Sequence, residues 1–180
     1  MISSIENRRS VRTYLNKDVE EEKLLEILKS AQAAPSGSNT QPWNFILVKS
    51  EEKKEEITKA DYNQVWMKSA PIFIVCVADI RCRIKSEEEI VLDENTTLPE
   101  LKMIIRDCAI AIEHMLLEAE EQGLSSCWTG WYEQESMREI LHIPSDKYVC
   151  GVITLGYSEE INPMRPRRDL KEMIRYETWE

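Results

Sequence analysis

Histidines and glycines are too few in this sequence to build the common metal sites and nucleotide-binding loops. The 180 residues include two histidines and five glycines. His114 and His142 have no second histidine, cysteine or carboxylate at a familiar ligand spacing, which disfavours a metal hydrolase. The glycines form neither a G-x-G-x-x-G motif nor a Walker loop. A Rossmann dinucleotide-binding domain and a P-loop nucleotidase are therefore excluded.

The cysteines point to no cross-linked or metal-bound structure. There are five, an odd number, and no two of them form a C-x-x-C pair. Neither a disulfide framework nor a zinc or iron–sulfur ligand set is therefore suggested, and we expect no bound metal. Reduced, mostly buried thiols are expected at Cys76, Cys82, Cys108, Cys127 and Cys150.

Long hydrophobic runs are missing as well. Charges interrupt the apolar stretches before they reach membrane-spanning length, and MISSIENRRSVRTY at the N-terminus lacks the apolar core of a signal peptide. With 180 residues and 42% hydrophobic content, the chain can bury a core of its own. We expect one domain over residues 1–180, in a cytoplasmic protein that contacts no membrane.

Positive charge is scarce, and its distribution is uneven. The 33 acidic residues against 23 lysines and arginines give a net charge of −10, which opposes nucleic-acid binding because an acidic protein repels a polyanion. Two short segments nevertheless concentrate arginines. Each is either a solvated basic segment or part of a site for one phosphate group, since guanidinium groups make forked bonds to phosphate oxygens. The arginines are Arg8, Arg9 and Arg12 in RRSVR, and Arg165, Arg167 and Arg168 in RPRR.

Apolar residues at helical spacing predict a first helix over residues 19–34. Asp18 and Glu21 resemble a capping-box pair at its start, and Pro35 must end it. A short charged helix is expected at about 51–60.

The longest predicted helix covers residues 98–122 and ends at Gly123. Its apolar residues surround nearly the whole circumference, so it must be covered on several sides, either inside the domain or at a subunit interface. Residues 80–97 before it are acidic and lack periodicity, which predicts a mobile excursion or lid. A further helix is expected at 133–143.

Four apolar segments predict strands, at residues 43–48, 72–78, 125–131 and 148–156. A last short helix is expected from about Asp169. This order of elements favours an α+β domain over a doubly wound parallel sheet.

The segment PSGSNTQPW lies between the first helix and the first strand. Gly37 permits a close backbone approach, and the short polar side chains around it can bond a polar cofactor. An ordinary helix-to-strand turn has the same composition, so composition alone leaves both interpretations open.

Taken in order, four motifs resemble the flavin-dependent nitroreductase family. They are RRSVRTY, APSGSNTQPWNFILV, CWTGW after the long apolar helix, and LGY before an Arg-Pro-Arg tail. The resemblance spans essentially the entire chain, and PSGSNTQPW is its most specific element. It implies an α+β nitroreductase-like fold, in which helices flank a central, mostly antiparallel sheet and the long helix lies at a dimer interface.

The same resemblance implies an activity. The chain would be a homodimer with flavin mononucleotide (FMN) at the subunit interface, taking hydride from NADH or NADPH. The acceptor would be a small oxidised molecule such as a nitroaromatic or a quinone, reduced by a ping-pong mechanism. Because the flavin carries the hydride at its N5 atom, no side chain is expected to be catalytic.

The resemblance also assigns roles to single residues. Arg12 would reach the pyrimidine edge of the flavin ring and tune its potential, and Asn63 would contact the flavin. Thr129 and Gly130 would place backbone N–H groups at N5 and O4. The residues expected at the phosphate or ribityl chain are Arg8, Arg9, Ser10, Arg165 and Arg167. Those expected from the other subunit are Pro35, Ser36, Gly37, Ser38 and Asn39.

Two features depart from the better-known members of the family. Residues 80–97 are short and acidic where those members carry a helical excursion over the substrate pocket, and Trp66 stands where a basic residue is frequent. Trp128 and Trp131 flank the Thr129–Gly130 loop and either line the substrate pocket by stacking or, as is more usual for aromatic side chains, belong to the core. The tryptophans assigned to packing are Trp43 and Trp179.

Two other functions are compatible with the sequence. One is a flavin-binding storage or redox-sensing protein without turnover. The other is an enzyme of the same fold with dehydrogenase, dehalogenase or flavin-fragmenting activity.

Overall fold

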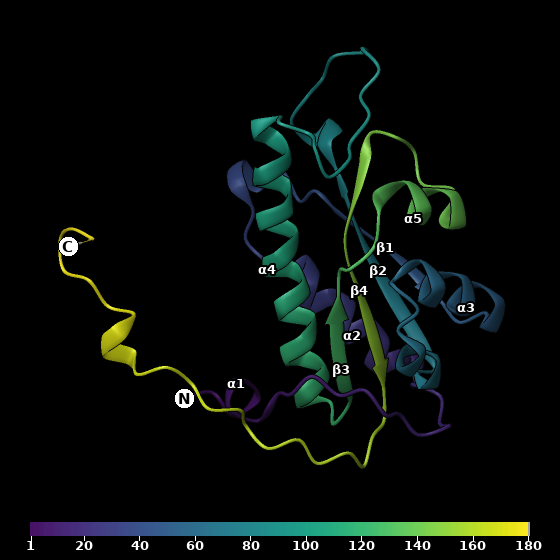
Figure 1. Cartoon of the computed structure of the whole chain (residues 1–180), viewed down its shortest axis with the longest axis vertical. Coiled ribbons are helices and arrows are strands. Elements are labelled where there is room, and N and C mark those ends of the chain that lie inside the picture. The colour runs from purple at the N-terminus through teal and green to yellow at the C-terminus, as the bar shows by residue number, and fades with distance from the viewer. Residues whose placement is uncertain (180) are drawn as a thin grey trace.

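The computed structural model describes residues 1–179, and a four-stranded sheet with strand order β1-β2-β4-β3 forms its centre (Figure 1). All three strand pairs are antiparallel. The strands are β1 (Trp43–Val48), β2 (Ile72–Asp79), β3 (Ser125–Thr129) and β4 (Lys147–Gly156). The helices are α1 (Ser3–Asn7), α2 (Glu21–Gln32), α3 (Glu51–Ala60), α4 (Pro99–Glu121) and α5 (Gln134–Leu141). The predicted α+β class is therefore confirmed, whereas residue 180 of the predicted domain lies outside the described residues.

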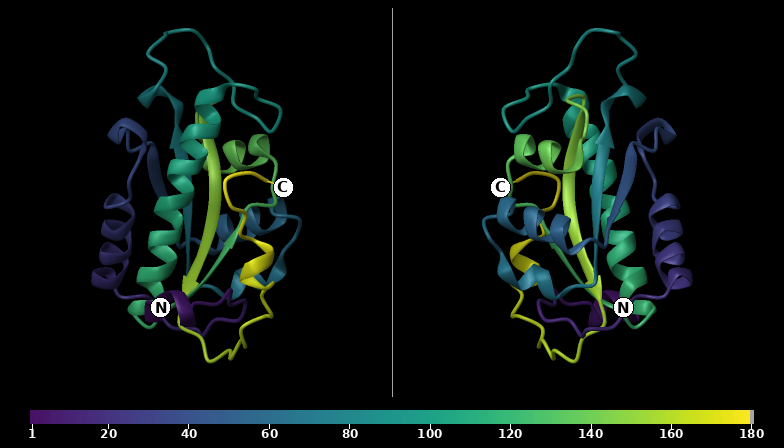
Figure 2. Two further views of the ribbon diagram at one scale, coloured as in Figure 1. Left: turned by 90° about the vertical axis from the view of Figure 1, so that its left-hand side faces the viewer. Right: turned by 90° about the vertical axis from the view of Figure 1, so that its right-hand side faces the viewer.

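Side-chain alternation along β2 divides the core into two layers. Ile74 packs into the cluster under α2 and α4, and the next residue, Val75, packs into the cluster under α3 and α5. Figure 2 shows these helix pairs on opposite faces of the sheet. Because β2 is covered on both faces, its sequence is apolar up to its last residue, Asp79, rather than alternating.

Helix α2 is shorter than predicted, and the predicted capping box is wrong. The helix runs Glu21–Gln32, and its N-cap residue Glu20 makes no side-chain capping bond. Asp18 lies before the helix and is exposed. The Glu20 carboxylate instead accepts a 2.6 Å hydrogen bond from the Tyr157 hydroxyl. This contact joins positions far apart in the sequence, so no local pattern could reveal it.

Helix α4 confirms the predicted long helix. It ends as expected before Gly123, whose φ of 71° is the left-handed conformation that glycine adopts readily. Ile104 and Ile112 are fully buried, but Met103 and Ile110, which lie on one face seven residues apart, are exposed in the single chain.

Residues 80–97 form a loop that projects beyond one end of the sheet (Figure 1). The only helical turn in this loop is the 3₁₀ turn Ile80–Cys82. Contacts with the body anchor it: Arg81 bonds Asp146 at 2.7 Å, the Leu92 N–H donates to the Ser145 carbonyl at 2.9 Å, and the Leu92 side chain is fully buried. The predicted excursion is present, and its mobility stays a prediction.

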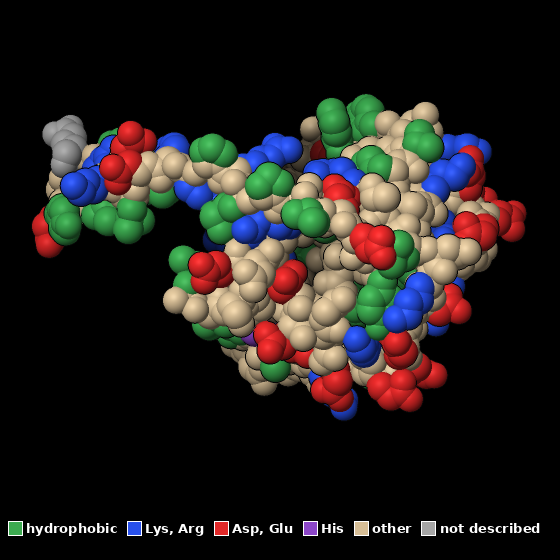
Figure 3. Space-filling model, turned by 90° about the horizontal axis from the view of Figure 1, so that it is seen from below, with side chains coloured by type: hydrophobic (Ala, Val, Ile, Leu, Met, Phe, Trp, Pro, Cys, Tyr) green, Lys and Arg blue, Asp and Glu red, His purple; other side chains and the backbone are tan. Residues whose placement is uncertain are grey.

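After β4 the chain leaves the body as an arm, residues 158–179 (Figures 1 and 3). The helix expected from Asp169 is a single 3₁₀ turn, Leu170–Glu172. Trp179 is 85% exposed, so its assignment to packing is wrong within one chain, while Trp43 is buried as expected. No helix within residues 1–179 is long and apolar enough to cross a membrane.

Candidate functional site

The two arginine segments, from opposite ends of the chain, meet in one hollow of about 500 Å³. We call it the arginine pocket. It is lined by Arg8, Arg9, Ser10, Arg12, Asn162, Pro163, Arg165 and Arg167. The structure therefore brings together all the residues that the sequence assigned to the phosphate and ribityl chain.

Backbone bonds to β3 place the first segment. Ser10 forms a parallel bridge with Ser126, and the Val11 N–H donates to the Ser126 carbonyl at 3.0 Å. The second segment is tied to the first by Asn162, whose side-chain amide donates to the Ser10 carbonyl at 3.2 Å. Both arginine segments are thus held beside the edge strand β3.

Glu160 adds further hydrogen bonds between the two arginine segments. One oxygen of its carboxylate accepts from the backbone N–H groups of Arg12 at 3.0 Å and Thr13 at 2.8 Å. The Arg12 N–H, the Asn162 amide and Thr13 hold the pKa of Glu160 below its usual value, because their bonds favour the ionised form.

The pocket's cations have few internal partners. Arg8 pairs with Glu113 at 3.8 Å, and the Nε atom of Arg9 is buried without a hydrogen-bond partner. Among residues 1–179, no carboxylate lies within 4.0 Å of the guanidinium groups of Arg165 or Arg167. Nη1 of Arg9 donates to the backbone carbonyls of Glu6 at 2.7 Å and Arg8 at 2.8 Å, whereas Arg165 and Arg167 have no ion-pair partner within residues 1–179. Guanidinium groups gathered in this way are suited to a phosphate.

A second hollow, of about 510 Å³, lies farther along β3. We call it the aromatic cavity, and it is lined by Gln64, Trp128, Thr129, Gly130, Trp131 and Cys150. Trp128 and Trp131 are 39% and 67% exposed, so the expectation that they belong to the core is wrong. Trp131 also stacks against the exposed ring of Tyr62, with centroids 5.0 Å apart.

Gly151 makes room for one of these rings. A Cβ atom on this glycine would lie 2.1 Å from the indole nitrogen of Trp128, which no side chain could tolerate. Cys150, beside it, sits opposite an irregularity in the β2–β4 register. A hydrogen bond with Cys108, together with burial, raises the pKa of the Cys150 thiol, which disfavours a thiolate in the cavity wall.

A buried carboxylate supports the floor of the aromatic cavity. Asp61 has no exposed surface and accepts hydrogen bonds from the Thr129 hydroxyl at 2.6 Å and the Gln64 amide at 2.9 Å. The Gln64 amide also donates to the Thr129 oxygen at 2.8 Å. Sequence reasoning missed Asp61 and Gln64, because a lone acid after a helix is usually exposed.

Trp66 connects the two hollows. The Arg12 guanidinium lies over its ring, 5.4 Å from the centroid, and its indole N–H donates to the Gln64 side-chain carbonyl at 3.0 Å. At the position where a basic residue is frequent in the family, Trp66 offers an aromatic face to the Arg12 guanidinium. The arginine pocket and the aromatic cavity share no lining residue, but the contacts of Trp66 link them into one candidate site with a cationic end and an aromatic end, which we call the elongated site.

Two predicted parts of the flavin site, Asn63 and the loop of residues 35–39, do not line either hollow. Asn63 has an exposed side chain beside the site, but the adjacent Gln64, rather than Asn63, lines the cavity. The loop of residues 35–39 lies beside the upper half of α4 in Figure 1, whereas α1, which directly precedes the first residues of the arginine pocket, lies at the lower end. One chain does not bring this loop to the site, as expected if it serves the other subunit.

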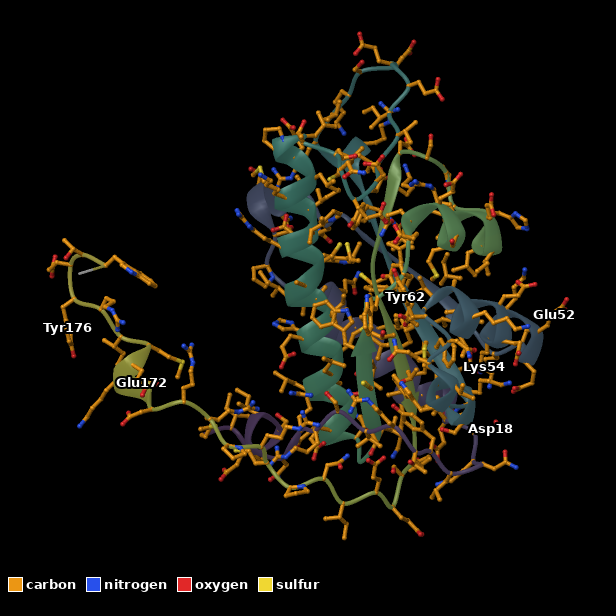
Figure 4. All side chains as sticks on the ribbon, viewed as in Figure 1. Asp18, Glu52, Lys54, Tyr62, Glu172 and Tyr176 are labelled. Carbon is orange, nitrogen blue, oxygen red and sulfur yellow. The ribbon has the colours of Figure 1, made fainter. Side chains whose placement is uncertain are left out.

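A third hollow, of about 510 Å³, lies near Asp18 and Lys54 on the side away from the arm (Figure 4). Its most buried cation, Lys54, already bonds the Ala70 carbonyl at 2.9 Å and pairs with Glu51 at 2.7 Å. It contains none of the residues that the sequence assigned to a site. The elongated site is the stronger candidate.

The geometry agrees with a comparison to known families. The family model described as Nitroreductase family matches residues 5–157. The chain belongs to the nitroreductase family. The prediction from the four sequence motifs is confirmed.

Individual members of the nitroreductase family are similar over most of their length. A protein of Archaeoglobus fulgidus, named provisionally as an NADH dehydrogenase/NAD(P)H nitroreductase, is 31% identical over 164 residues, covering 88% of this chain and 86% of the relative. An FMN reductase (NADPH) of Bacillus subtilis is 30% identical over 173 residues, covering 92% and 69%. An FMN-dependent nitroreductase structure from Clostridium difficile R20291 matches with a TM-score of 0.80 at 31% identity, covering 99% of this chain and 100% of that one.

Proposed function

We propose that this nitroreductase-family chain is an FMN-dependent oxidoreductase that passes hydride from NADH or NADPH to a small aromatic acceptor. One observation carries the proposal: Trp66 links Arg12 of the arginine pocket to Gln64 of the aromatic cavity, which the Thr129–Gly130 loop also lines. Relatives named as an FMN reductase and an FMN-dependent nitroreductase support the choice of cofactor.

The residues present fit an FMN phosphate. A buried guanidinium nitrogen without a partner, in Arg9, and two arginines without carboxylate partners, Arg165 and Arg167, are donors that lack an acceptor within the described chain. A phosphate supplies such acceptors. The proposed phosphate and ribityl ligands are Arg8, Arg9, Ser10, Arg165 and Arg167.

The other end of the site suits the flavin ring. Bound there, the flavin would supply the hydride chemistry through its N5 atom. The Thr129 and Gly130 backbone would face N5 and O4, and Asp61 would fix this loop through the Thr129 hydroxyl. Arg12, held over Trp66, would supply positive charge at the pyrimidine edge, and Asn63 would add a further contact.

A homodimer would complete the site. Met103 and Ile110 leave one apolar face of α4 exposed, and the arm carries further exposed apolar side chains. A second copy of the chain would cover both surfaces, since isolated domains rarely leave such faces open. The residues proposed to reach the partner's flavin are Pro35, Ser36, Gly37, Ser38 and Asn39.

The exposed rings support the choice of a flat aromatic acceptor. Trp131 and Tyr62 form a stacked pair at the mouth of the aromatic cavity, and Trp128 forms part of its wall. Flat aromatic molecules stack on such surfaces, which favours nitroaromatics and quinones over aliphatic acceptors.

A turnover assay tests the proposal. FMN-loaded protein should oxidise NADH or NADPH when a quinone or a nitroaromatic is added, and parallel lines in double-reciprocal plots should reveal ping-pong kinetics. If the protein binds FMN but oxidises neither donor with any acceptor of the panel, it is a flavin-binding protein without turnover. If only dehydrogenation, dehalogenation or flavin fragmentation is observed, the acceptor class is wrong.

A further inference from the structure

Both polar backbone groups of Gly37 are held by one ion pair. The Gly37 N–H donates to the two carboxylate oxygens of Asp107, each at 3.3 Å, and the Gly37 carbonyl accepts from Nη2 of Arg83 at 3.0 Å. The same Nη2 atom lies 3.1 Å from Asp107. Asp107 belongs to α4 and Arg83 to the start of the projecting loop, so three distant parts of the chain meet at one residue.

The absence of a side chain at Gly37 permits this arrangement. A Cβ atom there would lie 2.5 Å from Nη2 of Arg83. The sequence predicted a close approach at Gly37, and the group that approaches within this chain is the Arg83 guanidinium. The glycine is required for this contact and not for a left-handed φ, which its neighbours adopt instead.

The loop beyond Gly37 has a defined but unfavourable shape. Ser38 and Asn39 both have φ of 55°, a conformation that residues with a Cβ atom rarely adopt. Local bonds support it: the Asn39 N–H donates to the Ser36 carbonyl at 2.9 Å, and the Gln41 N–H donates to the Ser36 hydroxyl at 3.0 Å. The result is an exposed loop whose Ser38 side chain makes no hydrogen bond within residues 1–179.

The ion pair itself is a poor source of stability. The side chains of Arg83 and Asp107 are only 11% and 12% exposed, and Nε of Arg83 is buried without a partner. Buried pairs of this kind rarely stabilise a fold more than apolar residues would, because desolvation offsets the attraction. Unfavourable conformations and desolvated charges persist where they hold a functional geometry.

We propose that Arg83 and Asp107 form a clamp that presents Ser38 and Asn39, in their left-handed conformation, to the flavin bound by the other subunit. This rests on the proposed FMN site at a dimer interface. It makes Arg83 and Asp107 positioning residues that touch no cofactor. The first part of the 80–97 segment then has a structural role, because it supplies the arginine of the clamp.

The clamp is tested first without flavin. Hydrogen–deuterium exchange should be faster at Gly37 and Asn39 in Arg83→Met than in the wild type. Arg81→Gln is the matched control. Arg81 lies in the same segment as Arg83, but it pairs at 2.7 Å with Asp146 and makes no ion pair with Asp107 beside Gly37. If exchange at these amides is unchanged both in Arg83→Met and in the shape-conserving Asp107→Asn, the clamp is refuted, whether or not the protein binds FMN.

The second test asks whether the clamp serves the partner's flavin. Arg83→Met should weaken FMN binding about tenfold, the scale of one lost polar contact, with the dimer retained. Arg81→Gln should stay within about twofold. If Arg83→Met folds poorly, Asp107→Asn carries the same test.

Mixed dimers show whether the clamp acts on the flavin of its own subunit or on the flavin of the partner. Differently tagged chains carrying Arg83→Met and Arg167→Ala are purified as one dimer. If the clamp acts on the partner, both defects fall in one site and the other site binds FMN with wild-type affinity. Two weakened sites, each with a single defect, and no site of wild-type affinity would overturn the proposal. Wild-type protein that binds no FMN would instead refute the proposed function.

Discussion

The hydroxyl of Thr129 donates a 2.6 Å hydrogen bond to the carboxylate of Asp61, which has no exposed surface. This bond ties the end of β3 to the turn that follows α3. In the proposed enzyme it fixes the segment whose backbone faces the reactive edge of the flavin.

Replacing Thr129 by valine should destabilise the protein before any cofactor is added. The change removes a hydrogen bond to a buried carboxylate, worth about 1.5 to 3 kcal/mol of unfolding free energy. Urea denaturation measures the loss, and Thr97→Val, at an exposed threonine, should stay within about 0.5 kcal/mol. Equal effects of the two substitutions would contradict the importance of the Asp61 contact.

Arg167→Ala should weaken FMN binding by about one to two decades. A charge-assisted bond to phosphate contributes about 1.5 to 3 kcal/mol, and 1.4 kcal/mol corresponds to a factor of ten. Arg168→Ala is the matched control, because Arg168 is the next residue but does not line the arginine pocket. Quenching of flavin fluorescence measures both. Unaltered affinity with a collapse of turnover would show that Arg167 does not bind the phosphate.

Arg12→Gln should lower the reduction potential of the bound flavin, because it removes positive charge that favours the reduced ring. A fall of about 30 mV corresponds to about 1.4 kcal/mol for a two-electron couple. Equilibrium titration against a reference dye measures the potential. Arg175→Gln, which removes the comparable arginine over Trp179 at 5.5 Å in the arm, should leave it unchanged. A constant or raised potential in Arg12→Gln would place Arg12 away from the ring.

Ile110→Glu should convert the dimer to monomers. The substitution places a carboxylate on the exposed apolar face of α4, where it would be desolvated against the second subunit. Sedimentation velocity reports the association state. Val91→Glu changes an apolar residue in the projecting loop that is more exposed than Ile110, and it should leave the dimer intact. A dimeric Ile110→Glu protein would assign the interface to another surface.

The sequence predicted those elements whose signal is local. The periodic segments of α3 and α4 gave helices with nearly the observed bounds, and Gly123 has the expected left-handed conformation. The family motifs identified the arginines of the pocket. At the start of α2 the local pattern predicted the wrong cap: the N-cap residue is Glu20, whose carboxylate bonds the distant Tyr157 instead of the helix.

Residues that act through distant partners escaped prediction. Asp61, Gln64 and Arg83 are ordinary polar residues in the sequence, and their importance comes only from where the fold places Thr129 and Gly37. The prediction for Trp128 and Trp131 was wrong for a different reason. Burial is the usual fate of a large aromatic side chain, and Trp128 and Trp131 depart from it because they line a cavity.

Anaerobic titration of the purified protein tests the central claim most directly. FMN is added to cofactor-free protein and visible spectra are recorded, followed by NADH or NADPH. The account predicts one FMN per chain and complete loss of the oxidised flavin band after one equivalent of the donor. A protein that binds no FMN, or whose bound flavin keeps its oxidised spectrum with both donors, would contradict it.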